Sequence, residues 1–153
     1  MIQDHLGRFP RFDGLSKSEI RTLERAFSAK RYRKGQVLMR QGDRARGPDA
    51  SVYLVLKGCA QLAFRDTTGA TLRRTLGPGE LIGVIALVRD TERTATVTVN
   101  EPSMIATFDR AGLHRLATDN PSAWARIQHV IALQLAADSR AMHDRLSAAV
   151  LPK

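Results

Sequence analysis

The chain has 153 residues, of which 43% are hydrophobic and 25% charged, a composition that suits one globular domain with its own core. Its apolar runs are far shorter than the ~20 residues of a membrane-spanning helix, and its first residues lack the apolar segment of a secretory signal. Its single cysteine excludes a disulfide framework and a zinc site of several thiolates. We therefore expect a single domain over residues 1–153, cytoplasmic and without a membrane span.

The 24 Lys and Arg residues outnumber the 15 Asp and Glu residues, which gives a net charge of +9. Such an excess favours an anionic partner, whether nucleic acid, phospholipid or a small phosphate ligand. The densest basic cluster comprises Lys30, Arg31, Arg33, Lys34, Arg40, Arg44 and Arg46. A solvated face explains this cluster as well as a docking surface does, so the charge alone leaves both interpretations open.

The first element is expected to be helical. Ser16 and Glu19 have the spacing of a capping box, in which each side chain accepts a hydrogen bond from the other residue's backbone N–H at a helix start. The apolar residues that follow share one helical face; they are Ile20, Leu23, Ala26 and Phe27. We expect residues 1–34 to form an N-terminal helical segment, which ends at Gly35.

Short β-rich runs recur between glycine turns over residues 35–108. The runs cover residues 37–39, 52–56, 60–64, 71–76, 94–99 and 104–108. Strands at this spacing, joined by turns, predict an antiparallel β-roll or jelly-roll barrel. With helices on either side of it in the chain, the expected fold class is α+β and mainly β.

Helical periodicity returns over residues 109–153. A short helix at 110–118 precedes Asn120-Pro121, which is a helix-start signal, and residues 122–150 contain neither glycine nor proline. A helix of that length would be roughly 40 Å long, more than a small barrel covers. Its apolar residues include Ile131, Leu135, Met142 and Leu146. We expect this stripe to join two copies of the chain as a homodimer, because two-fold dimers dominate among oligomers.

A glycine-rich turn and a following arginine make residues 77–96 the candidate binding site. Gly83 opens a short helical run, and Arg93 and Thr94 follow at the start of a strand. Backbone N–H groups at a helix start suit an anion, and a glycine lets the ligand approach closely. An arginine can grip phosphate oxygens bidentately, while a threonine adds neutral donors. In isolation, the same pattern is more often a structural turn beside a surface arginine.

Two motifs in this order resemble the signatures of the cyclic nucleotide-binding domain family, the β-roll sensor of catabolite-activator-like regulators, cyclic-nucleotide-gated channels and kinase regulatory subunits. The first motif is Val37-Leu38, Gly42-Asp43, Val52-Tyr53-Leu54-Val55 and Gly58, and the second, the phosphate-binding cassette, is Gly83, Ala86-Leu87 and Arg93-Thr94-Ala95. The resemblance covers about residues 10–145.

The resemblance implies a set of ligand contacts. Arg93 would pair with the cyclic phosphate, and Thr94 would bond it through its side chain and backbone. The N–H groups near Ile85 and Ala86 would complete the cradle, and Gly83 would lie against the ribose. The long C-terminal helix would cap the base and form the dimer seam. We expect Arg93 to be exposed and therefore not part of the core.

Val84 departs from the family pattern. The family's cassette carries a glutamate at this position, which accepts a hydrogen bond from the ribose 2′-hydroxyl. Losing a charged acceptor costs ~1.5–3 kcal/mol, so the affinity for a cyclic nucleotide would fall about ten- to a hundredfold. The candidate ligand-binding residues are therefore Gly83, Val84, Ile85, Ala86, Arg93 and Thr94.

The function expected from the sequence is a ligand-sensing module that binds a cyclic nucleotide such as cyclic AMP and signals to an unidentified protein partner. We expect no cofactor, no metal and no catalysis, because no nucleophile and base stand in a recognisable arrangement. The sequence shows no helix-turn-helix segment for specific DNA recognition. One alternative is an interaction module that has kept the β-roll and lost the nucleotide. Another is non-specific nucleic-acid binding by the basic surface.

Overall fold

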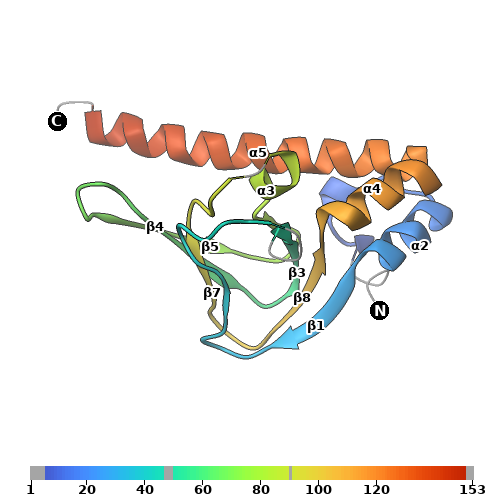
Figure 1. The fold of residues 1–153 in the computed structure, drawn as a ribbon, viewed down its shortest axis with the longest axis horizontal. Helices are drawn as coiled ribbons and strands as arrows, with labels where there is room; N and C mark the ends of the chain where they lie inside the picture. The colour runs from blue at the N-terminus through green and yellow to red at the C-terminus, as the bar shows by residue number, and fades with distance from the viewer. Residues whose placement is uncertain (1–5, 47–49, 90, 151–153) are drawn as a thin grey trace.

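The computed structural model describes residues 6–46, 50–89 and 91–150. Its elements are, in order, η1 (Pro10–Phe12), α2 (Lys17–Ala26), β1 (Ser28–Tyr32), β2 (Val37–Met39), β3 (Val52–Lys57), β4 (Ala60–Arg65), β5 (Thr71–Leu76), β6 (Leu81–Ile82), α3 (Ile85–Val88), β7 (Thr96–Val99), β8 (Ser103–Phe108), α4 (Arg110–Asp119) and α5 (Pro121–Val150). The expected α+β, mainly antiparallel β-roll with a long C-terminal helix is confirmed (Figure 1).

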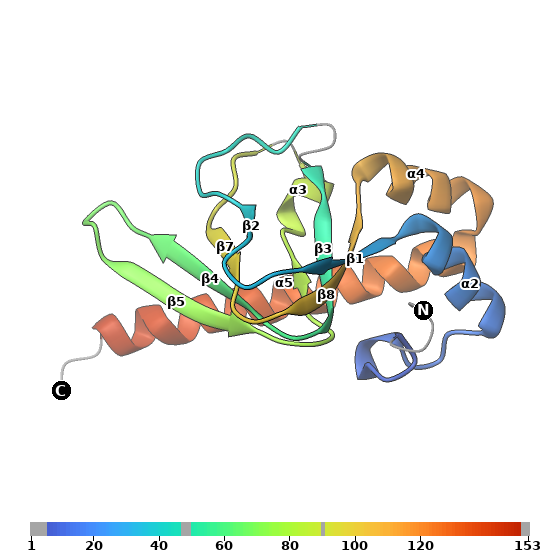
Figure 2. The ribbon, with the colours of Figure 1, turned by 90° about the horizontal axis from the view of Figure 1, so that it is seen from below.

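The strands form two four-stranded sheets, with the orders β1-β8-β3-β6 and β2-β7-β4-β5. Every pairing is antiparallel. Figure 1 shows α5 running the length of the molecule, beside α4 and α2 at its N-terminal end and alongside the β4–β5 hairpin towards its C-terminal end. Figure 2 shows the same helix from below, crossing the roll.

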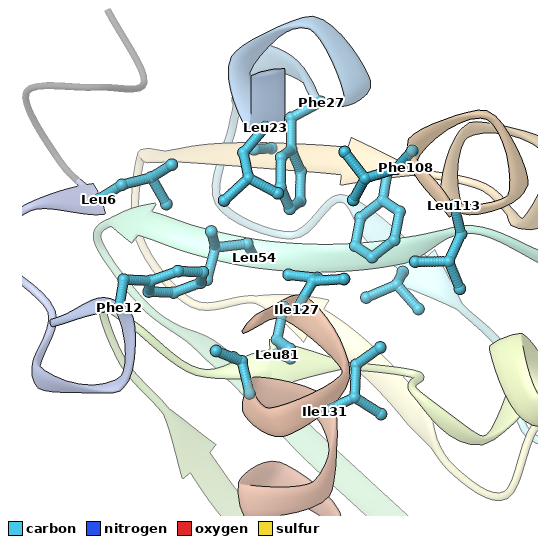
Figure 3. Packing of buried hydrophobic residues seen from close by; sticks show 14 of the residues in the cluster. Leu6, Phe12, Leu23, Phe27, Leu54, Leu81, Phe108, Leu113, Ile127 and Ile131 are labelled. Atoms are coloured by element: carbon cyan, nitrogen blue, oxygen red, sulfur yellow. The ribbon is translucent and has the colours of Figure 1, made fainter. Parts of the chain in front are cut away.

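The larger hydrophobic core lies where the helices meet the first sheet. Figure 3 shows Leu54 and Leu81 from the sheet facing Ile127 and Ile131 of α5. A second core fills the space between the sheets; it contains Met39, Val55, Ala60, Leu76, Ile82 and Val97. Because the N-terminal half of α5 is part of the main core, Ile131 is buried within its own chain and is not available to a dimer seam.

The expectation of a helical segment over residues 1–34 is wrong after Ala26. α2 begins at the predicted capping box, since Ser16 Oγ accepts from the Glu19 N–H at 3.1 Å and Glu19 Oε2 accepts from the Ser16 N–H at 2.8 Å. The chain then turns extended at Phe27, whose ring packs edge-on against Phe108 at 4.6 Å between centroids. β1 follows and pairs with β8, so a distant strand overrides the local helical pattern.

All seven residues of the basic cluster are exposed, which fits a solvated face and a docking surface equally. Within the three described ranges, no helix combines the length and the apolarity that crossing a bilayer requires.

Candidate functional site

The cassette begins at β6, a two-residue strand that pairs with β3 and that the sequence pattern did not predict. Gly83 follows with a φ of +81°, a conformation that glycine adopts without steric cost. The chain then enters α3, and the Ala86 N–H donates to the Gly83 carbonyl at 3.2 Å. This bond means that Ala86, which we expected to offer its N–H to a phosphate, uses it to close the turn.

The end of the cassette is tied to the loop after β2. The Arg93 N–H donates to the Asp43 carbonyl at 2.7 Å, and the Gly42 N–H donates to the Arg93 carbonyl at 2.9 Å. The Ala45 N–H donates to the Thr91 carbonyl at 3.1 Å. The two motifs of the sequence, far apart in the chain, therefore hold each other in place through backbone hydrogen bonds.

All six predicted site residues line one cavity of about 60 Å³. They are Gly83, Val84, Ile85, Ala86, Arg93 and Thr94, and the remaining lining residues are Met39, Leu62, Thr91, Glu92 and Asp138. We call this space the cassette cavity. The structure thus brings the predicted residues together, although a space of this size alone is smaller than ordinary ligand pockets of ~300–1,000 Å³.

Arg93 is buried, with 6% of its surface exposed, which corrects the expectation of an exposed arginine outside the core. Its Nη2 donates to the Ser51 carbonyl at 2.8 Å, and its Nη1 lies 3.5 Å from the Gly83 carbonyl. A buried guanidinium needs acceptors for its donors, and these carbonyls supply them. The approach is close, because a Cβ at Gly83 would come within 2.5 Å of Nη1.

Val84 is 2% exposed and belongs to the main hydrophobic core. Its side chain brings no hydrogen-bond acceptor to the cassette cavity, and its burial explains why an apolar residue is stable there. Ile85 differs, since it is 39% exposed at the start of α3.

A second and larger cavity, of about 490 Å³, adjoins the first and was not predicted from the sequence. We call it the apolar cavity. It lies between the β4–β5 hairpin and α5 and is lined by Leu62, Phe64, Leu72, Arg74, Ile85, Thr94, Ala95, Leu135, Asp138, Ser139, Ala141, Met142 and Arg145. The two cavities share Leu62, Ile85, Thr94 and Asp138. The only signal in the sequence was the alternation of apolar residues along the hairpin, which does not reveal what lies opposite.

Polar side chains link α5 to the roll beside these cavities. Gln134 is fully buried, and its Oε1 accepts from the Leu81 N–H at 2.9 Å. Its Nε2 donates to Asp138 Oδ1 at 2.9 Å, and Arg74 Nη1 donates to the same oxygen at 2.7 Å. Arg74 also pairs with Glu80, at 3.1 Å between Nη2 and Oε1. Sequence analysis missed this network because its members come from three separate elements.

Residues 29–120 match the model of the cyclic nucleotide-binding domain. This chain belongs to that family. Its sequence is 34% identical to the cyclic AMP receptor protein of Thermus thermophilus over 102 residues, which is 65% of this chain and 45% of the relative. It is 36% identical to the acetyltransferase Pat of Mycolicibacterium smegmatis over 91 residues, 60% of this chain and 26% of the relative. The chain spans less than half the length of these curated relatives.

Solved structures confirm the fold. A cyclic nucleotide-binding domain from Methylobacillus flagellatus superposes with a TM-score of 0.84 at 20% identity, over 99% of this chain and 84% of the other. The catabolite activator protein of Thermus thermophilus superposes with a TM-score of 0.72 at 27% identity, over 90% of this chain and 63% of the other.

Proposed function

We propose that this protein is a regulatory module that binds a cyclic nucleotide, with cyclic AMP as the first candidate, and signals to a protein partner. One observation carries the proposal: all six cassette residues surround one cavity, and that cavity adjoins an apolar one. Arg93 and Thr94 offer donors to a phosphate, while the apolar cavity suits a base. We further propose that it acts in the cytoplasm and catalyses no reaction itself.

The affinity that the cassette contacts alone can supply is weak. Val84 offers no acceptor for the ribose, so these contacts should bind about ten- to a hundredfold more weakly than a cassette with a glutamate there, with a dissociation constant in the micromolar range or above. Val84→Glu should lower that constant only if no other group accepts a hydrogen bond from the ribose hydroxyl, and because Val84 is buried, the stability of this variant is measured beside its affinity.

Isothermal titration calorimetry with cyclic AMP and cyclic GMP tests the proposal. Thr94→Ala removes a donor from the cassette cavity and should weaken binding, while its exposed position should leave the stability of the fold unchanged. Thr98→Ala is the matched control, since Thr98 lies in β7 and does not line either cavity. Absence of heat at millimolar concentrations of both nucleotides would refute a nucleotide-sensing role.

A second candidate function is an interaction module that has lost the nucleotide. The observation that favours it is a hydrogen bond within the chain, which the Arg93 guanidinium donates to the Ser51 carbonyl. A ligand phosphate would have to compete with that carbonyl or share the guanidinium with it. The same titration separates the two candidates.

We also propose that the module is a homodimer joined through the C-terminal half of α5. Met142 and Leu146, four residues apart on one face of that half, are 42% and 57% exposed. Leu146→Asp should yield a monomer in sedimentation velocity at micromolar concentration, because an unpaired charge is costly in an apolar seam. Ser147→Asp, on the neighbouring exposed position, should leave the dimer intact. A monomeric wild-type protein would contradict the proposal.

A further inference from the structure

A 3′,5′-cyclic nucleotide retains one free hydroxyl on its sugar, the 2′-hydroxyl, because its 3′- and 5′-oxygens are esterified in the phosphate ring. Enclosing that hydroxyl in a cavity is costly unless an acceptor receives its proton. Val84 has none to offer. This inference rests on the proposed function. If the chain binds a cyclic nucleotide, another group near the cassette must accept the hydrogen bond of the 2′-hydroxyl.

The shape of the ligand indicates where that group lies. The sugar lies between the phosphate and the base, so a phosphate in the cassette cavity and a base in the apolar cavity would bring the sugar to the boundary between them. Four residues line both cavities: Leu62, Ile85, Thr94 and Asp138. Asp138 alone among these four carries a carboxylate.

We propose that Asp138 of α5 accepts the hydrogen bond of the ribose 2′-hydroxyl. Its carboxylate is held in a fixed orientation, because Oδ1 accepts from Arg74 at 2.7 Å and from the buried Gln134 at 2.9 Å. A carboxylate has about four acceptor positions on its two oxygens, so these two bonds leave capacity for a third. A group held in place beforehand loses little entropy when it binds a ligand.

Glu92 is the competing acceptor, since it is the other carboxylate that lines the cassette cavity. It lines only that cavity, and its side chain is exposed. Its backbone pairs with Arg44, which ties this part of the chain to the loop after β2. The position at the boundary between the two cavities therefore favours Asp138. Its carboxylate accepts hydrogen bonds from Arg74 of β5 and from Gln134 of α5.

The test compares cyclic AMP with 2′-deoxy cyclic AMP, two ligands that differ by the one hydroxyl. The wild-type protein should bind cyclic AMP about ten- to a hundredfold more tightly. Asp138→Ala should weaken cyclic AMP to the level of the deoxy analogue and leave the analogue almost unaffected, so that the ratio of the two dissociation constants falls to about one. Asp138→Asn keeps a carbonyl acceptor and should give an intermediate ratio, and it serves in place of Asp138→Ala if that variant does not fold.

Two controls separate this role from a structural one. Arg74→Gln breaks the ion pair but leaves the carboxylate, so it should retain the ratio even if both affinities shift. Glu92→Gln should also retain it. The inference is overturned if the wild-type protein binds both ligands equally, if Asp138→Ala weakens both by the same factor, or if Glu92→Gln is the variant that abolishes the ratio. In these outcomes the nucleotide still binds, so the proposed function survives; binding of neither ligand would overturn both.

Discussion

Replacing Arg93 with alanine should destabilise the fold as well as remove a ligand contact. The side chain is 6% exposed and donates from Nη2 to the Ser51 carbonyl at 2.8 Å, which links the cassette to the residue just before β3. The substitution takes the charged donor away from that carbonyl and leaves a space behind it. A hydrogen bond from a charged group contributes about 1.5–3 kcal/mol to the free energy of unfolding.

For a chain of about this length, 1 kcal/mol shifts the melting temperature by roughly 2–4 °C, so the expected fall in Tm is about 3–12 °C. The assays are thermal unfolding for Tm and urea unfolding for the free energy of unfolding, both followed by the fluorescence of Trp124, the single tryptophan, which packs against the main core. Arg140→Ala is the control, because Arg140 has 83% of its side chain exposed and its ion pair with Asp144 is long, at 3.7 Å. Such exposed pairs contribute little to stability.

An Arg93→Ala variant with unchanged unfolding free energy would refute this reasoning, since it would mean that the bond to Ser51 makes no net contribution. The reasoning would also fail if the Arg140→Ala control lost as much stability. Either way, the fall in ligand affinity of an Arg93 variant can be interpreted only after its stability has been measured.

Gly58→Ala should lower the free energy of unfolding in urea by about 2–4 kcal/mol. The φ of Gly58 is +94°, and the new Cβ would come within 2.9 Å of the Ser103 Cα and would crowd the Ser103 hydroxyl. A variant as stable as the wild-type protein would contradict this close contact. Ser16→Ala should lower the free energy of unfolding in urea by about 1 kcal/mol, since it removes the N-cap side chain of α2. An unchanged urea midpoint would show that the capping box does not stabilise the fold. The pKa of Glu19 is held below its usual value by hydrogen bonds from the Ser122 hydroxyl and the Ser16 N–H. Its stabilising effect is therefore present above the pKa of an unfolded glutamate and is lost as the pH falls; Ser122→Ala should make stability less dependent on pH between about 5 and 3, and an unaltered profile would contradict this.

Local signals in the sequence predicted the elements whose causes are local. The capping box of Ser16 and Glu19 and the Asn120-Pro121 start of α5 both act within a few residues, and both are confirmed. β1 was missed because its hydrogen bonds go to β8, whose pairing residues begin at Ser103. Nothing in residues 28–32 themselves distinguishes an exposed edge strand from an exposed helical turn.

The candidate site likewise has features that could be predicted from the sequence and features that depend on distant contacts. Gly83, Arg93 and Thr94 could be singled out from their residue types and order, the other cassette residues followed from the resemblance to the family, and all six gather around one cavity. The burial of Arg93 could not be found, because it depends on the carbonyl of Ser51, more than forty positions earlier. The apolar cavity and the Asp138 network depend on how α5 lies along the β4–β5 hairpin, which is a property of the packed chain.

The buried Gln134 also has a mechanical consequence. It fixes α5 to β6 next to the cassette, and the 16 residues beyond it extend for about 24 Å as one continuous helix. The residues of α5 that line the two cavities all belong to this part of the helix, so a ligand that tilts it by about 10° about Gln134 would displace the far end by about 4 Å. Leu146, near that far end, would travel furthest. A small adjustment around a ligand would thus be magnified at the surface where a second molecule could detect it.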